Sequence, residues 1–265
     1  MDKQQKTELS NHLEDKKYKI GFALSGGGAR GFAHLGAIQA LKEHGISPDI
    51  IAGTSAGALA GVFLADGYEP AEVMDVFNKM SFREFTDFSI PKNGIFTTKR
   101  LQDILKKHIR AKSFEELKIP LVVNTSDFEK GETIYFSEGP LIMPIVASCS
   151  FPIVFMPTII DNVQHADGGL LKNLPASAIR KQCEKVIGVN VSPISTKYVK
   201  NNLIGVLEKS IQFMLDATTI PDIPLCDMLI KPLEVRKHSI FDVKASKEIY
   251  EVGYLAAKEE LEKNE

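Results

Sequence analysis

The stretch Ile51-Ala52-Gly53-Thr54-Ser55-Ala56-Gly57-Ala58-Leu59 determines how the rest of the chain is interpreted. The apolar residues at its start predict a short buried strand, and the uncharged, alanine-rich segment 56–65 predicts a tightly packed helix. Ser55 therefore lies at a strand-to-helix turn of the form Gly-x-Ser-x-Gly. Glycines allow the sharp backbone of a nucleophile elbow, and the helix N-terminus behind the serine favours developing negative charge. We predict that Ser55 is a nucleophile supported by Gly53 and Gly57; a turn that serves only close helix packing is the alternative.

The residues before the elbow predict a strand, a glycine loop, a helix and a second strand. Residues 17–25 become increasingly apolar, which favours a strand entering a core. The loop Gly26-Gly27-Gly28-Ala29-Arg30-Gly31 follows, and residues 33–44 then show apolar side chains at helical spacing. A second strand begins at Pro48 and leads to Ser55. This order is typical of a βα unit with parallel strands, so we expect an α/β fold.

The segments after the elbow predict further helices and strands. We expect helices at 70–80, 97–109, 203–215 and from 244, a short helix up to Gln182, and strands at 121–123, 133–136, 186–191 and 228–230. The uncharged segment 139–160 is long enough to span a bilayer, but three prolines divide it, so we expect a buried helix, a turn and a strand. Residues 82–96 are rich in aromatic side chains, which fits either a lid over a site or a plug under a long connection.

Composition narrows the class of protein. Of the 265 residues, 44% are hydrophobic and 25% are charged, which is enough apolar content for an ordinary globular core. The formal net charge of −2 is too close to balance to favour a nucleic-acid partner. The odd number of cysteines and their spacing predict neither a disulfide framework nor a metal site; we expect buried thiols in a reducing, cytoplasmic compartment at Cys149, Cys183 and Cys226.

The glycine loop has two interpretations. Gly26-x-Gly28-x-x-Gly31 matches the dinucleotide fingerprint between a strand and a helix. That site also needs an acidic residue near the end of the second strand, where this chain has Gly53-Thr54-Ser55. Alternatively, the loop amides point into one concavity and bind an oxyanion, with the Arg30 side chain either steering an anionic head group or capping nearby structure.

A serine nucleophile needs a base. Histidine is the usual one, and six are present: His12, His34, His44, His108, His165 and His238. Of these, only His238 follows Asp167, as the order Ser, Asp, His of α/β-hydrolases requires. Asp167-Gly168-Gly169 places an acid at a strand end, before two glycines that allow a tight turn.

The glycine loop, the elbow and Asp167-Gly168-Gly169 together resemble the bacterial branch of the patatin-like phospholipase family. Two further segments, Ala147-Ser148-Cys149-Ser150-Phe151-Pro152 and Asn173-Leu174-Pro175, are similar to family segments, and the resemblance fades after Val191. It implies a mostly parallel sheet sandwiched between helices. It also implies a Ser–Asp dyad without histidine, with Ser55 as nucleophile, Asp167 as base and the amides of the glycine loop as oxyanion hole. Partial burial would raise the Asp167 pKa and make it a better base.

The polar composition of the N-terminus and the family resemblance set the remaining expectations. We expect a disordered polar tail at 1–17, without a secretory signal, and a single patatin-like domain at 18–265, with the motifs in 19–191 and a C-terminal helical extension at 200–265. The expected activity is serine hydrolysis of lipid esters, without a cofactor or metal. A lipid-binding or regulatory protein with a vestigial site is the second hypothesis, and dinucleotide binding is the third. Docking of the protein on a membrane surface is left open.

Overall fold

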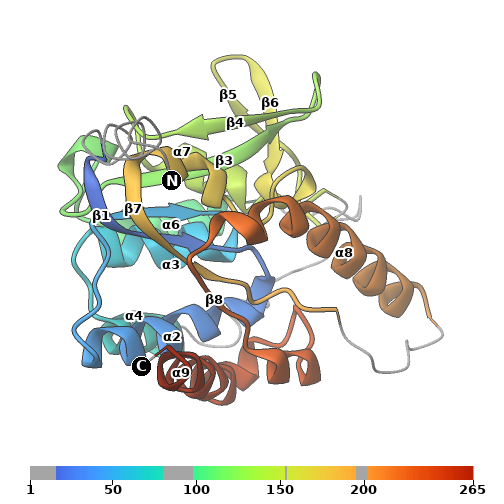
Figure 1. The fold of residues 1–265 in the computed structure, drawn as a ribbon. Coiled ribbons are helices and arrows are strands. Elements are labelled where there is room, and N and C mark those ends of the chain that lie inside the picture. Colours follow the sequence, from blue (N-terminus) through green and yellow to red (C-terminus); the bar gives the residue numbers. More distant parts are fainter. Residues whose placement is uncertain (1–15, 80–97, 153, 195–201, 265) are drawn as a thin grey trace, which may run out of the picture.

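The computed structural model describes residues 16–79, 98–152, 154–194 and 202–264. An eight-stranded sheet flanked by helices forms the centre of this described part (Figure 1). Its strands run in the order β5-β6-β3-β2-β1-β7-β8, with β4 paired to β3 beside this path. The predicted α/β class, with a central sheet between helices, is confirmed.

The sheet has a parallel half and an antiparallel half. The parallel half consists of β3 (Leu121–Asp127), β2 (Ile50–Gly53), β1 (Tyr18–Leu24), β7 (Cys183–Val189) and β8 (Met228–Ile230). The antiparallel half pairs β4 (Glu132–Phe136) and β6 (Val163–Asp167) with β3, and β5 (Thr158–Ile160) with β6. β3 belongs to both halves, so it joins the elbow strand β2 to β6, the strand that ends at Asp167.

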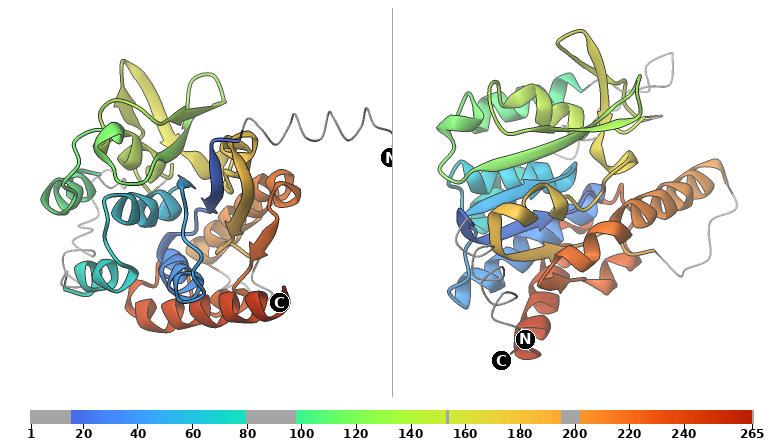
Figure 2. Two further views of the ribbon diagram at one scale, coloured as in Figure 1. Left: turned by 60° about the vertical axis from the view of Figure 1, so that its left-hand side comes forward. Right: turned by 45° about the horizontal axis from the view of Figure 1, so that its top comes forward.

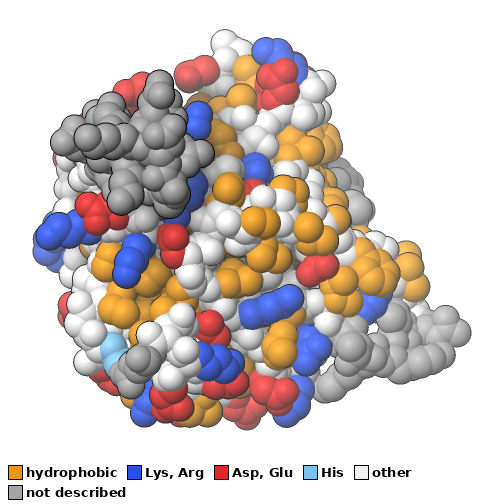
Figure 3. Space-filling model, viewed as in Figure 1, with side chains coloured by type: hydrophobic (Ala, Val, Ile, Leu, Met, Phe, Trp, Pro, Cys, Tyr) orange, Lys and Arg blue, Asp and Glu red, His pale blue; other side chains and the backbone are white. Residues whose placement is uncertain are grey.

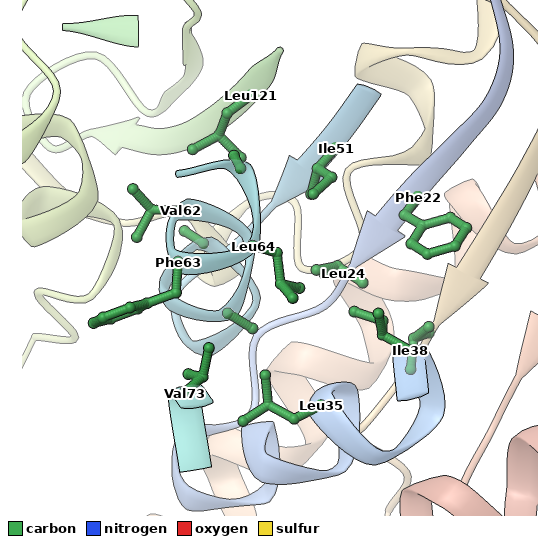
Figure 4. Close-up of a cluster of buried hydrophobic side chains, with 14 of the residues drawn as sticks. Phe22, Leu24, Leu35, Ile38, Ile51, Val62, Phe63, Leu64, Val73 and Leu121 are labelled. Atoms are coloured by element: carbon green, nitrogen blue, oxygen red, sulfur yellow. The ribbon is translucent and has the colours of Figure 1, made fainter. Parts of the chain in front are cut away.

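Alternating side chains of the strands divide the core in two. Phe22, Leu24 and Ile51 belong to the larger cluster, where they face helices (Figure 4). These helices include α2 (Phe32–Glu43), α3 (Ala56–Ala65), α4 (Pro70–Lys79), α6 (Lys99–His108), α7 (Ile142–Ser148) and α9 (Ser246–Glu262). Ala23 and Ala52 point to the opposite face, which is covered by short 3-10 turns at Ala176–Ala178, Arg180–Gln182 and Ile220–Leu225. The layer on this second face is therefore thin.

The C-terminal third completes the sheet and its helical cover. β8 extends the parallel half beyond β7, and α9 packs on α2. The two helices approach closely because Gly36 and Gly253 lack side chains: a Cβ at Gly36 would lie 1.9 Å from the Tyr250 carbonyl oxygen. In contrast, α8 (Leu203–Thr219) projects from the edge of the molecule (Figures 1 and 2).

Most of the predicted elements are present, with one correction. The expected short helix up to Gln182 consists of separate 3-10 turns, a form that rarely extends beyond one turn. The segment 139–160 forms α7, a turn and β5, as predicted from its prolines, and among the described residues no helix is long and apolar enough to cross a bilayer. Most of the predicted tail and the whole aromatic segment 82–96 lie outside the described residues.

Candidate active site

The elbow is a strained turn between β2 and α3. β2 ends at Gly53, α3 begins at Ala56, and Ser55 between them has φ 50° and ψ −117°. The flanking glycines are required by close approach, because a Cβ at Gly53 would lie 2.6 Å from the Gly57 carbonyl oxygen and a Cβ at Gly57 would lie 2.2 Å from that of Leu24. A non-glycine residue with positive φ persists only where surrounding structure holds it. Ser55 is such a residue, and its side chain is only half-buried.

Asp167 lies at the end of β6 and is 3% exposed. Its Oδ1 accepts a hydrogen bond from the Gly169 amide at 2.8 Å, and the Ser55 side chain interacts with its carboxylate. Burial raises the pKa of Asp167 to about 7, while the interactions with Ser55 and with the Gly169 amide lower it. The structure therefore brings together the two residues predicted to form a dyad, and places a carboxyl group that titrates near neutral pH beside the serine.

Two serines that the sequence did not assign hold the dyad in place. The Ser55 amide donates to Ser148 Oγ at 2.8 Å, and the Asp167 amide donates to the Ser150 carbonyl oxygen at 3.0 Å. Ser148 is the last residue of α7, and Ser150 lies two residues beyond it; both are fully buried. The similarity of residues 147–152 to a family segment marked this region in the sequence, but it did not indicate what the two serines do. The segment connects the turn of the nucleophile to the strand of the acid.

Several amides of the glycine loop donate to backbone carbonyl oxygens of the protein itself. The Gly26 amide donates to the Asn173 carbonyl oxygen at 3.1 Å, that of Ala29 to Ile240 at 2.8 Å and that of Arg30 to Gly27 at 3.2 Å. Gly31 packs against the start of α3, where a Cβ would lie 2.6 Å from the Ala56 Cβ. The amides of Gly27 and Gly28 have no acceptor among the described residues. Within the predicted oxyanion loop, these two amides are therefore the ones that remain free to donate to a ligand in the described part of the chain.

The Arg30 side chain caps backbone carbonyls instead of facing an anion. It is 1% exposed, and its guanidinium donates twice to the His238 carbonyl oxygen, at 2.9 and 3.0 Å, and once to that of Pro193 at 3.3 Å. Of the two roles proposed from the sequence, steering of a head group is therefore wrong and capping is confirmed.

The rings of His34, His165 and His238 have partners other than Ser55 and Asp167, and His12 lies outside the described residues. His34 is buried with Nε2 2.8 Å from the Ser25 carbonyl oxygen, and burial lowers its pKa to about 4, so the ring is neutral. His165 Nδ1 lies 2.8 Å from Thr125 Oγ1. His238 Nε2 lies 3.9 Å from a Glu248 carboxylate oxygen. These contacts give no support to a histidine triad.

Cys149 lies beside the two residues of the dyad. Its thiol interacts with Ser55 and lies near the Asp167 charge; burial above all, and that charge, raise the Cys149 pKa well above its usual range. The three cysteines are free, as predicted, but Cys149 and Cys226 are half-buried and only Cys183 is fully buried. Because the thiolate is the nucleophilic form, the raised pKa keeps Cys149 unreactive beside Ser55.

The glycine loop does not fit a dinucleotide. The Ile240 carbonyl oxygen accepts a hydrogen bond from the Ala29 amide. It also lies beside Gly28, where a Cβ would be only 2.4 Å from it. A pyrophosphate would have to meet this electronegative oxygen, and β2 ends in glycine instead of the required acid. No cluster of three or more metal-ligating side chains occurs within the part of the chain that the structure describes.

Comparisons with known proteins agree with this geometry. The sequence model of the patatin-like phospholipase family matches residues 22–179. An uncharacterised NTE family protein of Mycobacterium bovis is 36% identical over 163 residues, 61% of this chain and 45% of the relative. The lysophospholipase NTE1 of Saccharomyces cerevisiae is 30% identical over 179 residues, 65% of this chain and 11% of the relative. The chain thus spans less than half of either relative.

The fold is shared with the solved structure of VipD from Legionella pneumophila. This structure superimposes with a TM-score of 0.54 at 15% sequence identity, over 93% of this chain and 67% of that one. The family match covers more than half of the chain and contains the glycine loop, the elbow and the acid motif. The chain therefore belongs to the patatin-like phospholipase family.

Proposed function

We propose that the protein is a serine hydrolase that cleaves carboxyl esters of lipids through an acyl-enzyme on Ser55, with Asp167 as the base. The observation that carries the proposal is the interaction between a serine on a strained turn and a buried carboxylate. The lipid class is supported by the family match and by the lysophospholipase name of the yeast relative.

Acylation follows from this arrangement. Ser55 Oγ attacks the ester carbonyl carbon while its proton passes to the Asp167 carboxylate. The carbonyl π electrons move to the oxygen, and the amides of Gly27 and Gly28 donate to the resulting oxyanion. When the tetrahedral intermediate collapses, the C–O bond to the alcohol breaks, and the alcohol leaves with the proton from Asp167.

Deacylation repeats these steps with water. Asp167 accepts a proton from a water molecule as its oxygen attacks the acyl carbon, and the same amides bind the second oxyanion. Collapse releases the fatty acid and returns the proton to Ser55 Oγ. A base with a pKa of about 7 suits both directions of transfer, because it is largely ionised just above neutral pH and still basic enough to accept the proton.

A panel of short- and long-chain acyl esters tests the proposal. The wild-type protein should release acid from at least one lipid ester, and Ser55→Ala and Asp167→Asn should each reduce turnover by at least about a thousandfold. Ser177→Ala, which removes an exposed hydroxyl, is the control and should behave as wild type. Binding of lipid without hydrolysis of any ester would favour the second hypothesis, a vestigial site.

The proposal includes contact with a lipid surface from the cytoplasm through α8. One side of this helix and the turn after it exposes Leu203, Val206, Phe213 and Ile220, which are 53–83% exposed and repeat at helical spacing. Hydrophobic side chains gather over α8 in Figure 3. The opposite side packs on the acid motif, where a Cβ of Gly169 would lie 2.6 Å from Leu215 Cδ2. The exposed apolar side therefore belongs to the helix that covers the turn of Asp167.

Sedimentation with phosphatidylcholine vesicles tests this contact. The triple substitution Leu203→Ser, Val206→Ser and Phe213→Ser should weaken vesicle binding at least tenfold. Burial of apolar area in the lipid contributes about 25 cal/mol per Å², and the variant has less apolar area to bury. Hydrolysis of a water-soluble ester should stay unchanged. Equal vesicle binding by the triple variant and wild type would contradict a lipid contact through α8.

A further inference from the structure

We propose that Ser192 is a positioning residue that, together with Ser25, turns the Gly26–Gly27 peptide so that the Gly27 amide faces the oxyanion at Ser55. This inference rests on the proposed function, since it assigns the groups that hold the oxyanion donor of that same site. Ser192 follows β7, just beyond the part of the chain that the family resemblance covers.

The carbonyl group of Gly26 is held by two hydroxyls. Ser192 Oγ donates to the Gly26 carbonyl oxygen at 2.5 Å, and Ser25 Oγ donates to it at 3.0 Å. In a planar trans peptide, the C=O and N–H bonds point in opposite directions. The two hydroxyls therefore fix the direction of the Gly27 N–H, which points away from them.

The surroundings of the two glycines show what lies on each side of this peptide. A Cβ at Gly27 would lie 3.1 Å from Ser192 Oγ and 2.7 Å from Val191 Cγ2, so this side of the loop rests on the chain after β7. A Cβ at Gly26 would instead lie 3.3 Å from the Ser55 Cβ. The peptide thus lies between Ser192 and Ser55. Because its N–H points away from the two hydroxyls and has no acceptor among the described residues, we infer that it faces the elbow.

The hydroxyls are themselves fixed by the end of β7. Ser25 Oγ accepts from the Val191 amide at 2.9 Å, so its proton is available for Gly26. The Ser192 amide donates to Asn190 Oδ1 at 3.0 Å, and Ser192 is 3% exposed. Oxyanion stabilisation depends on donors that are aimed before the reaction, because no free energy is then spent on turning them. Ser192 provides this order from behind the loop.

The experiment compares Ser192→Ala with the wild type, using a water-soluble ester and a trifluoromethyl ketone that forms a tetrahedral adduct on the serine. We expect kcat to fall about tenfold and the inhibition constant of the ketone to rise about tenfold, with KM changed less than about twofold, because only the tetrahedral state needs the donor. Ser192→Thr keeps the hydroxyl and should restore both values. Ser177→Ala is the control.

The outcomes separate this inference from the proposed function. If the wild type hydrolyses the ester but Ser192→Ala matches Ser177→Ala in kcat and in ketone affinity, the inference is wrong and the proposed function stands. If the wild type neither hydrolyses esters nor binds the ketone, the proposed function fails. Should Ser192→Ala not fold, Ser192→Cys, which keeps the volume but donates weakly, replaces it, with the same expected loss; an unchanged ketone affinity in that variant overturns the inference.

Discussion

The backbone amide of Ser55 donates a hydrogen bond to the hydroxyl oxygen of Ser148, across 2.8 Å and between the start of α3 and the end of α7. Ser55 has a positive φ, and this bond is one of the contacts that hold it there. Two residues later, the Ser150 carbonyl oxygen accepts a hydrogen bond from the Asp167 amide. The relative position of nucleophile and base is therefore set by the end of α7.

Ser148→Ala should damage both stability and activity. It leaves the Ser55 amide without its acceptor, which costs about 1–3 kcal/mol in the free energy of unfolding. The freed turn displaces Ser55 Oγ, so kcat/KM should fall by about 10- to 100-fold. Urea unfolding and ester kinetics measure the two effects. A variant with normal kinetics would show that Ser148 does not position the nucleophile.

The pH dependence of hydrolysis should follow Asp167. The base must be ionised to accept the proton of Ser55, so kcat/KM should rise with pH and level off above about pH 7. His238→Ala should keep the same profile, because its ring lies beside Glu248 and not beside Ser55. Loss of the rising limb in His238→Ala, with activity retained in Asp167→Asn, would favour a histidine base.

Asp167→Asn should stabilise the fold at alkaline pH while it abolishes turnover. The folded protein holds the Asp167 proton up to about pH 7, whereas the unfolded chain releases it near the usual 3.8. The resulting contribution is fully present below about pH 4 and is lost as the pH rises through about 7; it amounts to about 4 kcal/mol at most. Asparagine does not titrate and avoids this loss. The unfolding free energy of the variant minus that of wild type should rise by about 2–3 kcal/mol between about pH 5 and about pH 8, and a difference independent of pH would contradict the raised pKa.

Cys149 should not act as the nucleophile. Its raised pKa keeps the thiol protonated, so iodoacetamide should leave Cys149 unmodified in the native protein at about pH 8 and modify it after unfolding. Peptide mapping by mass spectrometry measures both states. Cys149→Ala should still react with a fluorophosphonate. Loss of that reaction would indicate that the nucleophile is the Cys149 thiol and not Ser55.

Gly28→Ala should destabilise the glycine loop much more than a matched change elsewhere. Gly28 has φ 57°, and the new Cβ would lie 2.4 Å from the Ile240 carbonyl oxygen. Gly131 also has positive φ, 71°, but a Cβ there meets nothing within 4 Å, so Gly131→Ala adds only backbone strain of about 1 kcal/mol. Thermal unfolding of both variants separates the clash from the strain. Equal losses would mean that Ile240 does not pack on the loop.

Local sequence patterns predicted the helices and strands of this fold because each pattern depends on residues that are close together in the sequence. The apolar runs of β1 and β2, the glycines of the elbow and the prolines around α7 each act within a few residues. The contacts that complete the site are different. The partners of the glycine loop are Asn173, Ser192 and Ile240, which come from distant segments and follow no local period. Arg30 shows most clearly what a local pattern cannot predict. Only the folded chain reveals that its guanidinium donates to the backbone carbonyl oxygens of His238 and Pro193.

The most direct test of the central claim is to map the covalent adduct of a fluorophosphonate on the wild-type protein and on Ser55→Ala. A phosphonate that requires an activated serine should attach to the peptide that contains Ser55, more slowly below about pH 7, where Asp167 is protonated. The adduct should be absent from Ser55→Ala. Labelling of another residue, or equal labelling of Ser55→Ala and the wild type, would contradict the account.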